Sequence, residues 1–209
     1  MSSHRATQPR QLCEPNHAQR LIPAVTTAVV LMLATASLQG GFAVASPFPN
    51  NKRSTVAFAI SASSFSNGGN IPKKFTCDGT DQSPQLSWTD PPPRTKTLAL
   101  LVDDPDAPIG NWNHWTLWNV PPTVRSLPEG MSKDANLPDG SQQGFNDFRK
   151  HGYNGPCPPP GKPHRYYFRL FALDVKLTLK ENASKRELEA ALKGHLLAQA
   201  EWMGRYARK

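Results

Sequence analysis

Short apolar runs separated by turn residues dominate the chain from residue 56 onward. Val56, Phe58 and Ile60 alternate with smaller residues, which is the period of a half-buried strand. Further strands are expected at residues 86–88 and at three longer apolar runs. These longer runs are Thr97–Val102, Trp115–Val120 and Tyr166–Leu173. The pattern predicts an all-β domain, or a β domain with a few helices.

Helical spacing is confined to the C-terminal part of the chain. Ser184 is followed three residues later by Glu187, which is the sequence of a capping box. Apolar or long side chains then recur at helical intervals, at Leu188, Ala191, Leu192, Leu196, Gln199 and Trp202. The spacing predicts a helix from about Lys185 to Gly204.

Composition and charge exclude several protein classes. Proline accounts for 21 of the 209 residues, about twice its usual frequency of roughly 5%, and this excludes a coiled coil or a long helical bundle. The 24 Lys and Arg residues exceed the 16 Asp and Glu residues by eight. Outside residues 205–209 no basic cluster is longer than two residues, so we expect no nucleic-acid partner.

The first 45 residues have the pattern of a secretory signal. Arg5, Arg10 and Arg20 precede the uncharged apolar stretch 21–38, and small residues follow at 43–45. We therefore expect cleavage after this segment and a secreted or periplasmic protein. The alternative is an uncleaved N-terminal membrane anchor, because an apolar stretch of 18 residues is at the short end of what spans a bilayer.

Removal of this segment would leave a mature chain that begins at Ser46. Residues 46–54 are polar and contain proline, so we expect a disordered lead-in there and a folded domain over 55–209. Cys77 and Cys157 are the cysteines that remain. Two thiols in an oxidising compartment favour one disulfide, and the alternative is that both are small buried apolar residues.

Three polar segments beside the predicted strands contain the residues that could carry chemistry. They are 103–108, 110–115 and 152–166. The first has three carboxylates within four residues, so a cation, a proton or a histidine has to offset their repulsion. In the other two, alternation places Trp112 with His114 on one face and His164 with Tyr166 on one face.

Five motifs, in this order and spacing, together resemble the phosphatidylethanolamine-binding protein family. They are TCDG at 76–79, DPDAP at 104–108, WNHW at 112–115, GPCPP at 155–159 and HRY at 164–166. The bacterial Raf kinase inhibitor-like branch is the most similar, and the resemblance covers roughly residues 56–208. It implies a mostly β fold, with a large antiparallel sheet packed on a smaller sheet, a C-terminal helix, and a small pocket for phosphate or a phosphorylated headgroup.

The resemblance also assigns residues to that pocket. The matching positions are Asp104, His114, Gly155, Pro156, His164 and Tyr166, with Asp106 and Trp112 beside them. One departure is Cys157, which replaces the second proline of many family members. The resemblance further implies a cis peptide bond between Ala107 and Pro108.

The chemistry of such a pocket follows from its residue types. Two imidazoles can donate to a phosphate, and a carboxylate bonded to one of them raises its pKa and fixes its tautomer. We therefore expect His114 and His164 to converge, with Asp104 within reach of one of them. Backbone N–H groups near Gly155 would add donors. Because no Lys or Arg is placed at the centre, affinity for bare phosphate should be weak.

The leading hypothesis is an exported, non-enzymatic binding protein for a small phosphorylated ligand or anion. It requires no cofactor and no metal, allows membrane contact that is at most peripheral, and allows a regulated protein partner, as in a kinase or protease inhibitor. A first alternative is a hydrolase that uses His114 or His164 with Asp104, although no G-x-S-x-G motif is present. A second is a zinc site that adds Asp106 to these three residues.

Overall fold

The computed structural model describes residues 57–209, so the expected signal segment, the expected lead-in at 46–54 and Val56 of the expected first strand lie outside the described residues. The first strand begins later than expected, at Ile60. The strands are β1 (Ile60–Ala62), β2 (Leu86–Trp88), β3 (Thr97–Asp104), β4 (Trp112–Val120), β5 (Ser126–Leu127), β6 (Gln142–Gln143), β7 (His164–Leu173) and β8 (Leu196–Tyr206). The helices are α1 (Lys185–Leu192) and the short 3-10 turn η1 (Lys73–Phe75). No helix among the described residues is long and apolar enough to cross a membrane.

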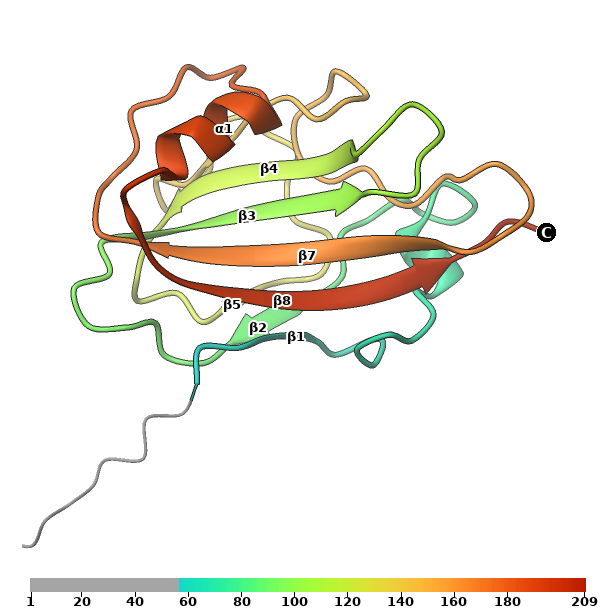
Figure 1. Cartoon of the computed structure of the whole chain (residues 1–209), viewed down its shortest axis with the longest axis horizontal. Helices are drawn as coiled ribbons and strands as arrows, with labels where there is room; N and C mark the ends of the chain where they lie inside the picture. The colour runs from blue at the N-terminus through green and yellow to red at the C-terminus, as the bar shows by residue number, and fades with distance from the viewer. Residues whose placement is uncertain (1–56) are drawn as a thin grey trace, which may run out of the picture. The chain divides into compact units, whose positions relative to one another are not determined.

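The strands form two antiparallel sheets, and the mostly β fold with a large and a small sheet is confirmed (Figure 1). The larger sheet has the order β6-β4-β3-β7-β8 and the smaller one has the order β1-β2-β5. Both β3 and β4 are buried along nearly their whole length. This explains why residues 97–102 of β3 form a nearly continuous apolar run and do not alternate.

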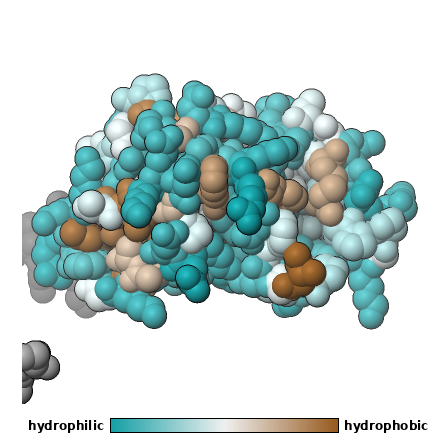
Figure 2. All heavy atoms as spheres, turned by 90° about the horizontal axis from the view of Figure 1, so that it is seen from above, coloured by the Kyte–Doolittle hydropathy of each residue, from teal (hydrophilic) through white to brown (hydrophobic). Residues whose placement is uncertain are grey.

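Side chains of the central strand β3 alternate between two cores. Leu98, Leu100 and Val102 point toward the smaller sheet, where they pack among residues such as Leu86. Ala99 and Leu101 point to the other face and pack beneath α1 with Leu188 and Leu192. The outer side of α1 is largely polar, and Figure 2 shows mainly hydrophilic side chains with scattered apolar ones on this side of the molecule.

The predicted helix begins where expected but is much shorter. The capping box of Ser184 and Glu187 is present, and α1 ends at Leu192. Gly194 has a φ of +82°, which favours glycine and ends the helix. The remaining residues form β8, which pairs with β7 along its whole length. The helix prediction was therefore wrong beyond Leu192, because pairing with the edge of the sheet overrode a spacing that also fits a strand.

The expected cis bond before Pro108 is also absent, since residues 57–209 contain no cis peptide bond. The turn that follows β3 is closed by a side chain. The backbone N–H of Asp106 donates to Oδ1 of Asp104 over 2.8 Å. Trans is the favoured form of the bond before proline, and this Asx-type turn reverses the chain with the bond left in that form.

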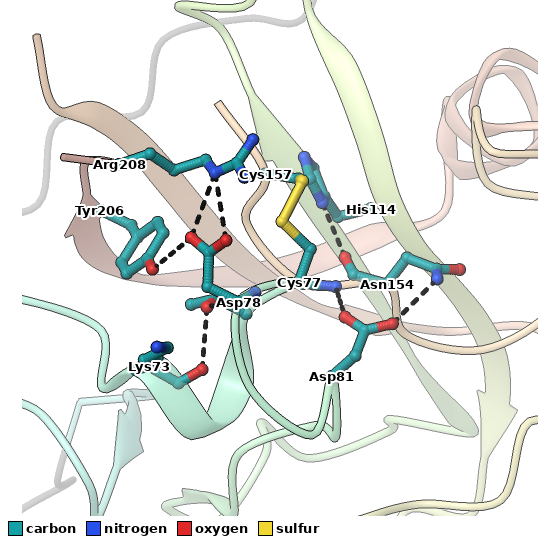
Figure 3. Close-up of a disulfide and its surroundings, with 11 residues drawn as sticks. Lys73, Cys77, Asp78, Asp81, His114, Asn154, Cys157, Tyr206 and Arg208 are labelled. Carbon is teal, nitrogen blue, oxygen red and sulfur yellow. Dashed lines mark hydrogen bonds and ion pairs between the residues drawn. A yellow bond between two sulfur atoms is a disulfide. The ribbon is translucent and has the colours of Figure 1, made fainter. Parts of the chain in front are cut away.

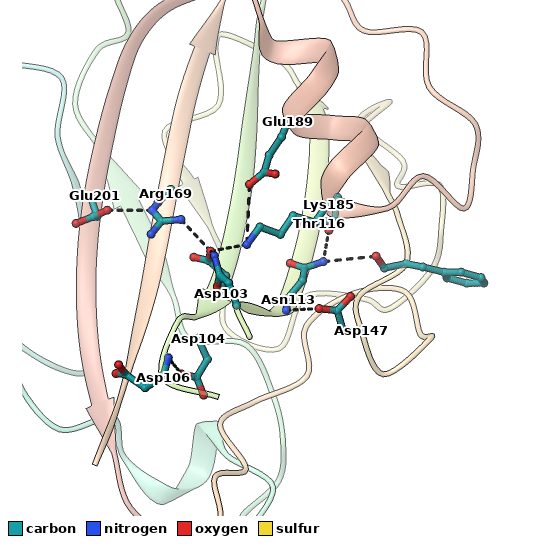
Figure 4. Close-up of polar contacts among 12 residues, drawn as sticks. Asp103, Asp104, Asp106, Asn113, Thr116, Asp147, Arg169, Lys185, Glu189 and Glu201 are labelled. Carbon is teal, nitrogen blue, oxygen red and sulfur yellow. Dashed lines mark hydrogen bonds and ion pairs between the residues drawn. The ribbon is translucent and has the colours of Figure 1, made fainter. Parts of the chain in front are cut away.

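Asp103, at the end of β3, is completely buried on the face of the large sheet that carries α1 (Figure 4). Its Oδ2 accepts hydrogen bonds from Arg169 over 2.8 Å, from Lys185 over 2.7 Å and from Asn111 over 2.6 Å. Arg169 comes from β7 and Lys185 from the first turn of α1. One buried carboxylate therefore joins the helix, the central strand and a neighbouring strand.

The segment before β7 is tied to residues 76–81 by a disulfide and hydrogen bonds (Figure 3). Cys77 and Cys157 are bonded, with their Cα atoms 5.4 Å apart, so the expected disulfide is present. Beside them the N–H of Cys77 donates to the carbonyl of Pro156 over 3.1 Å. Asp81 accepts from the N–H of Gly155 over 2.7 Å. This loop is thus fixed before it reaches the strand end.

Replacement of Asp103 by alanine should lower the free energy of unfolding by about 3–5 kcal/mol, because Lys185 and Arg169 would keep partly buried charges without this partner. The matched control is Asp90→Ala, since the Asp90 carboxylate is 88% exposed in its ion pair with Arg125. That change should cost at most about 1 kcal/mol. Urea unfolding of the full chain measures both, and equal losses would contradict the role given to Asp103.

Removal of the disulfide by the double change Cys77→Ser and Cys157→Ser should lower the free energy of unfolding by on the order of 4 kcal/mol. The bond closes a loop with a sequence separation of 80 residues, and its loss restores that loop's freedom in the unfolded chain. The unchanged protein in excess dithiothreitol serves as the control and should behave like the double variant. Unfolding curves that coincide with those of the oxidised protein would contradict this prediction.

Candidate functional site

A cavity of about 310 Å³ opens at the end of the large sheet where β3 ends and β4 and β7 begin. In an antiparallel sheet these three ends lie together, and Asp104 of β3 is paired in register with Trp112 of β4. The lining residues are Asp104, Ala107, Pro108, Ile109, Trp112, His114, Phe148, Cys157, Pro158, Pro159, His164 and Tyr166. The two histidines, 50 residues apart in the sequence, thus face one cavity.

Five of the eight residues expected in the pocket line it, and three do not. Asp106 points away and binds the guanidinium of Arg165 through both carboxylate oxygens, over 2.6 and 2.8 Å. This contact lowers the pKa of Asp106 to about 2. Gly155 and Pro156 lie behind the cavity wall. The N–H of Gly155 donates to Asp81, and the carbonyl of Pro156 accepts from the N–H of Cys77. The Gly155 N–H is therefore not free to bind a ligand.

Asp104 and His164 form a hydrogen-bonded pair in the wall of the cavity. Nδ1 of His164 and Oδ2 of Asp104 are 2.7 Å apart, and the two side chains are 13% and 4% exposed. Because a carboxylate accepts the bond, Nδ1 carries the hydrogen and Nε2 is the ring nitrogen left for other contacts. The second carboxylate oxygen holds the turn through Asp106. Asp104 thus orients the imidazole and fixes the loop at the same time.

His114 is held differently, by a backbone carbonyl. Its Nδ1 lies 2.7 Å from the carbonyl oxygen of Asn154 and donates to it. The residue is only 3% exposed, and burial lowers the pKa of its imidazole, opposed by the bond to Asn154 and by the charge of Asp104. A neutral ring that donates through Nδ1 has an acceptor at Nε2. The expectation that both imidazoles donate to the ligand is therefore corrected for His114.

Tyr166 contributes a hydroxyl group that lies near the Asp104 carboxylate but has no hydrogen bond of good geometry with it or with any other described residue. The residue is 1% exposed and its hydroxyl oxygen has no hydrogen-bond partner among residues 57–209. Burial first, and then the nearby Asp104 carboxylate, raise the pKa of this phenol above its usual range, so it stays protonated. Buried polar groups without a partner are rare in folded proteins. The cavity wall therefore contains a protonated phenol whose donor is unused.

The rest of the cavity wall is apolar, and it includes Phe148 and Ile109, which were not predicted from the sequence. Phe148 packs edge-on against Trp112 and His114, with ring centroids 5.4 and 5.3 Å apart. Ile109, at the rim, is 77% exposed. Ile109 follows the DPDAP motif directly, which could have drawn attention to it. Phe148 stands alone in a polar segment and carries no pattern that would have identified it.

A second cavity, of about 540 Å³, lies next to the first and shares His164 with it. Its other lining residues are Asp106, Lys162, Pro163, Arg165 and Arg205. This groove is therefore basic where the first cavity is apolar. In the zinc alternative Asp106 was a ligand, but it is bound to Arg165 here, and residues 57–209 contain no group of three or more potential ligands placed to hold a metal ion.

Comparison with known proteins gives a consistent result. A curated "UPF0098 protein" of Methanothermobacter thermautotrophicus is 49% identical over 144 residues, which cover 69% of this chain and 95% of that protein. A "UPF0098 protein" of Aquifex aeolicus is 48% identical over 147 residues, covering 69% of this chain and 85% of that protein.

Two solved structures resemble this fold. One is CT736 of Chlamydia trachomatis, described as a homologue of phosphatidylethanolamine-binding protein, with 41% identity, a TM-score of 0.67 and coverage of 73% of this chain and 99% of that one. The other is E. coli YbcL, described as a member of the mammalian family, with 36% identity, a TM-score of 0.69 and coverage of 74% and 100%.

The family model for the phosphatidylethanolamine-binding protein matches residues 61–207, which include every residue that lines the cavity. The chain therefore belongs to the phosphatidylethanolamine-binding protein family.

Proposed function

We propose that this protein is a non-enzymatic binding protein whose cavity takes phosphate or a phosphorylated headgroup. The observation that carries the proposal is the buried, unpartnered hydroxyl of Tyr166 beside the Asp104–His164 pair. Leaving such a group without a partner costs about 1–3 kcal/mol. A ligand oxygen that accepts from this hydroxyl recovers that cost, so the cavity favours an occupant with acceptor oxygens.

The apolar wall supports an ester over bare phosphate. The cavity wall contains Trp112 and Phe148, with Ile109 at its mouth, and no Lys or Arg lines it. A phosphate there lacks the bidentate cationic contacts that usually give tight binding. An organic substituent on the phosphate would gain from burial against this wall. An exposed apolar residue at the rim also fits peripheral contact with a lipid surface.

The absence of an activated nucleophile from the cavity wall supports binding without turnover. Cys157 is bonded to Cys77, Tyr166 stays protonated, and neither Ser nor Thr lines the cavity. We also propose that the protein acts outside the cytoplasm, as the pattern of its first 45 residues suggests. We further propose that it regulates a protein partner.

One feature favours a hydrolase as the second candidate. An aspartate that orients a histidine through Nδ1 is the arrangement found in acid–base catalysis, and His164 with Asp104 has it. Such an enzyme would activate a water molecule or use Nε2 of His164 as the nucleophile, because no Ser, Thr or free Cys lines the cavity.

The change Tyr166→Phe should weaken binding of methyl phosphate about 10- to 100-fold, the value of a hydrogen bond to a charged group. It should not lower stability, since the hydroxyl it removes has no protein partner. Isothermal titration calorimetry and urea unfolding measure the two effects.

The matched control for this change is Tyr153→Phe. The hydroxyl of Tyr153 donates to the carbonyl of Phe75 over 2.8 Å, away from the cavity lining. Its loss should cost about 1–3 kcal/mol of stability and leave the affinity unchanged. If Tyr166→Phe binds methyl phosphate as well as the unchanged protein does, the phenol is not a ligand-binding group.

Incubation of the full chain with excess methyl phosphate should leave the ester intact, because no Ser, Thr or free Cys lines the cavity. Phosphorus NMR distinguishes the ester from released inorganic phosphate. Phosphate release that exceeds the rate in buffer, and that is lost in His164→Ala, would replace the binding role with the hydrolase alternative.

A further inference from the structure

We propose that the cavity selects the monoprotonated form of a phosphomonoester, R–O–PO₃H⁻, over its dianion and over esters that carry no acidic O–H. His114 and Asp104 act as the specificity-determining residues. The inference rests on the proposed function, and it names which chemical form of the ligand is bound.

His114 presents an acceptor to the ligand. The carbonyl of Asn154 can only accept a hydrogen bond, so the 2.7 Å contact requires the proton on Nδ1. The carbonyl is itself fixed, because Asn154 and Gly155 are bound by the carboxylate of Asp81. Figure 3 shows the other ring nitrogen of His114 directed away from Asn154. In the neutral ring this nitrogen can be satisfied only by a donor, which a monoprotonated phosphate supplies through its P–OH.

Asp104 opposes a second negative charge in the same cavity. Its carboxylate is 4% exposed, and in this position charge repulsion is weakly screened by water. One oxygen accepts from His164 and the other from the backbone N–H of Asp106. Neither hydrogen bond cancels the negative charge that the carboxylate places in the cavity wall. A ligand with one negative charge therefore fits better than a ligand with two.

Tyr166 supplies the complementary donor. Its ring packs edge-on against His114, with centroids 5.2 Å apart, and its hydroxyl has no partner among the described residues. The cavity thus places one donor and one acceptor side by side. The monoanion of a phosphomonoester carries both a P–OH and unprotonated oxygens. Its dianion, a phosphodiester and a sulfate monoester all lack the O–H.

Several groups surround the His114 ring and could influence its protonation. From β3 these are the carboxylates of Asp104 and Asp103, and from β7 they are His164 and Tyr166. The segment before β7 adds the uncharged ring of Phe148 and the Asn154 carbonyl. The carboxylates favour the imidazolium form, and burial opposes it more strongly. An experiment therefore has to separate protonation of the ligand from protonation of the ring.

Calorimetric titration separates protonation of the ligand from protonation of the ring. The full chain is titrated with methyl phosphate and with methyl sulfate, from pH 8 to pH 5 at constant ionic strength. The methyl phosphate monoanion and methyl sulfate have the same charge and nearly the same shape, and they differ in one O–H. With a second pKa of about 6, the monoanion share rises from about 1% at pH 8 to about 90% at pH 5. Affinity for methyl phosphate should therefore rise about 90-fold. Methyl sulfate should bind at least about tenfold more weakly at pH 5, the value of one hydrogen bond, with little change across this range.

Two results would overturn the inference, and they differ in what else they imply. If methyl sulfate binds as tightly as methyl phosphate, or gains affinity equally as the pH falls, an imidazolium of His114 or His164 donates to either ester and the selection is absent, while the proposed function stands. If neither ester binds at any pH, the proposed function fails and the inference fails with it.

A variant and a spectrum test the role of His114 itself. In His114→Gln the side-chain amide can offer a donor, so the preference for methyl phosphate over methyl sulfate at pH 5 should shrink several-fold. Nitrogen-15 NMR of the unchanged protein does not depend on the variant's folding. It should show His114 neutral, with the proton on Nδ1, at pH 6, and a protonated Nε2 there would overturn the inference.

Discussion

Two adjacent carboxylates at the end of the central strand have to be buried on opposite faces of one sheet. Asp103 and Asp104 are consecutive residues of β3, so their side chains alternate. A buried carboxylate is costly unless it is paired and hydrogen-bonded. The contacts that satisfy these two groups determine where α1 lies on one face and where the cavity forms on the other.

On the face that carries α1, the contacts of Asp103 are structural. Lys185 and Arg169 both bind the same carboxylate oxygen, so the first turn of α1 cannot move without exposing a buried charge. On the opposite face the contacts of Asp104 shape the cavity that we propose as a binding site. The carboxylate orients His164 and closes the turn that leads to the apolar rim. One strand end thus couples the stability of the fold to the geometry of the cavity.

The cavity contains few polar groups, and each has a defined role. His164 is oriented by a carboxylate, His114 by a carbonyl, and Tyr166 by packing alone, which leaves its hydroxyl without a partner. Apolar side chains form the rest of the cavity wall. In the role proposed here, such a site obtains specificity from hydrogen-bond complementarity and from the single negative charge of Asp104. This distinguishes the cavity from the neighbouring groove, which is basic and contains Lys162 and Arg205.

Much of the architecture could be predicted from the sequence, because it depends on local patterns. The long apolar runs became β3, β4 and β7, and the capping box set the start of α1. The end of α1 was missed although Gly194 is a common helix-ending residue. The helical spacing continues past it, since residues 196–206 fit both periods and only pairing with β7 selects the strand.

The convergence of the site could be anticipated in part. Asp104, His114 and His164 lie at strand ends, which meet at one edge of an antiparallel sheet. Asp106 and Gly155 were expected there but are bound to Arg165 and Asp81. Competing partners of this kind, distant in sequence, leave no local signal. The same holds for Phe148, whose role depends entirely on where its loop folds back.

A crystal structure of the protein grown with methyl phosphate at pH 5 would test the central claim most directly, which is that the end of β3 builds an anion site in the apolar cavity. The account predicts the phosphoryl group between Tyr166 and His114, with one oxygen hydrogen-bonded to the phenol and another to Nε2 of the imidazole. A phosphoryl group bound instead in the basic groove, between Lys162 and Arg205, with the hydroxyl of Tyr166 still unpartnered, would contradict it.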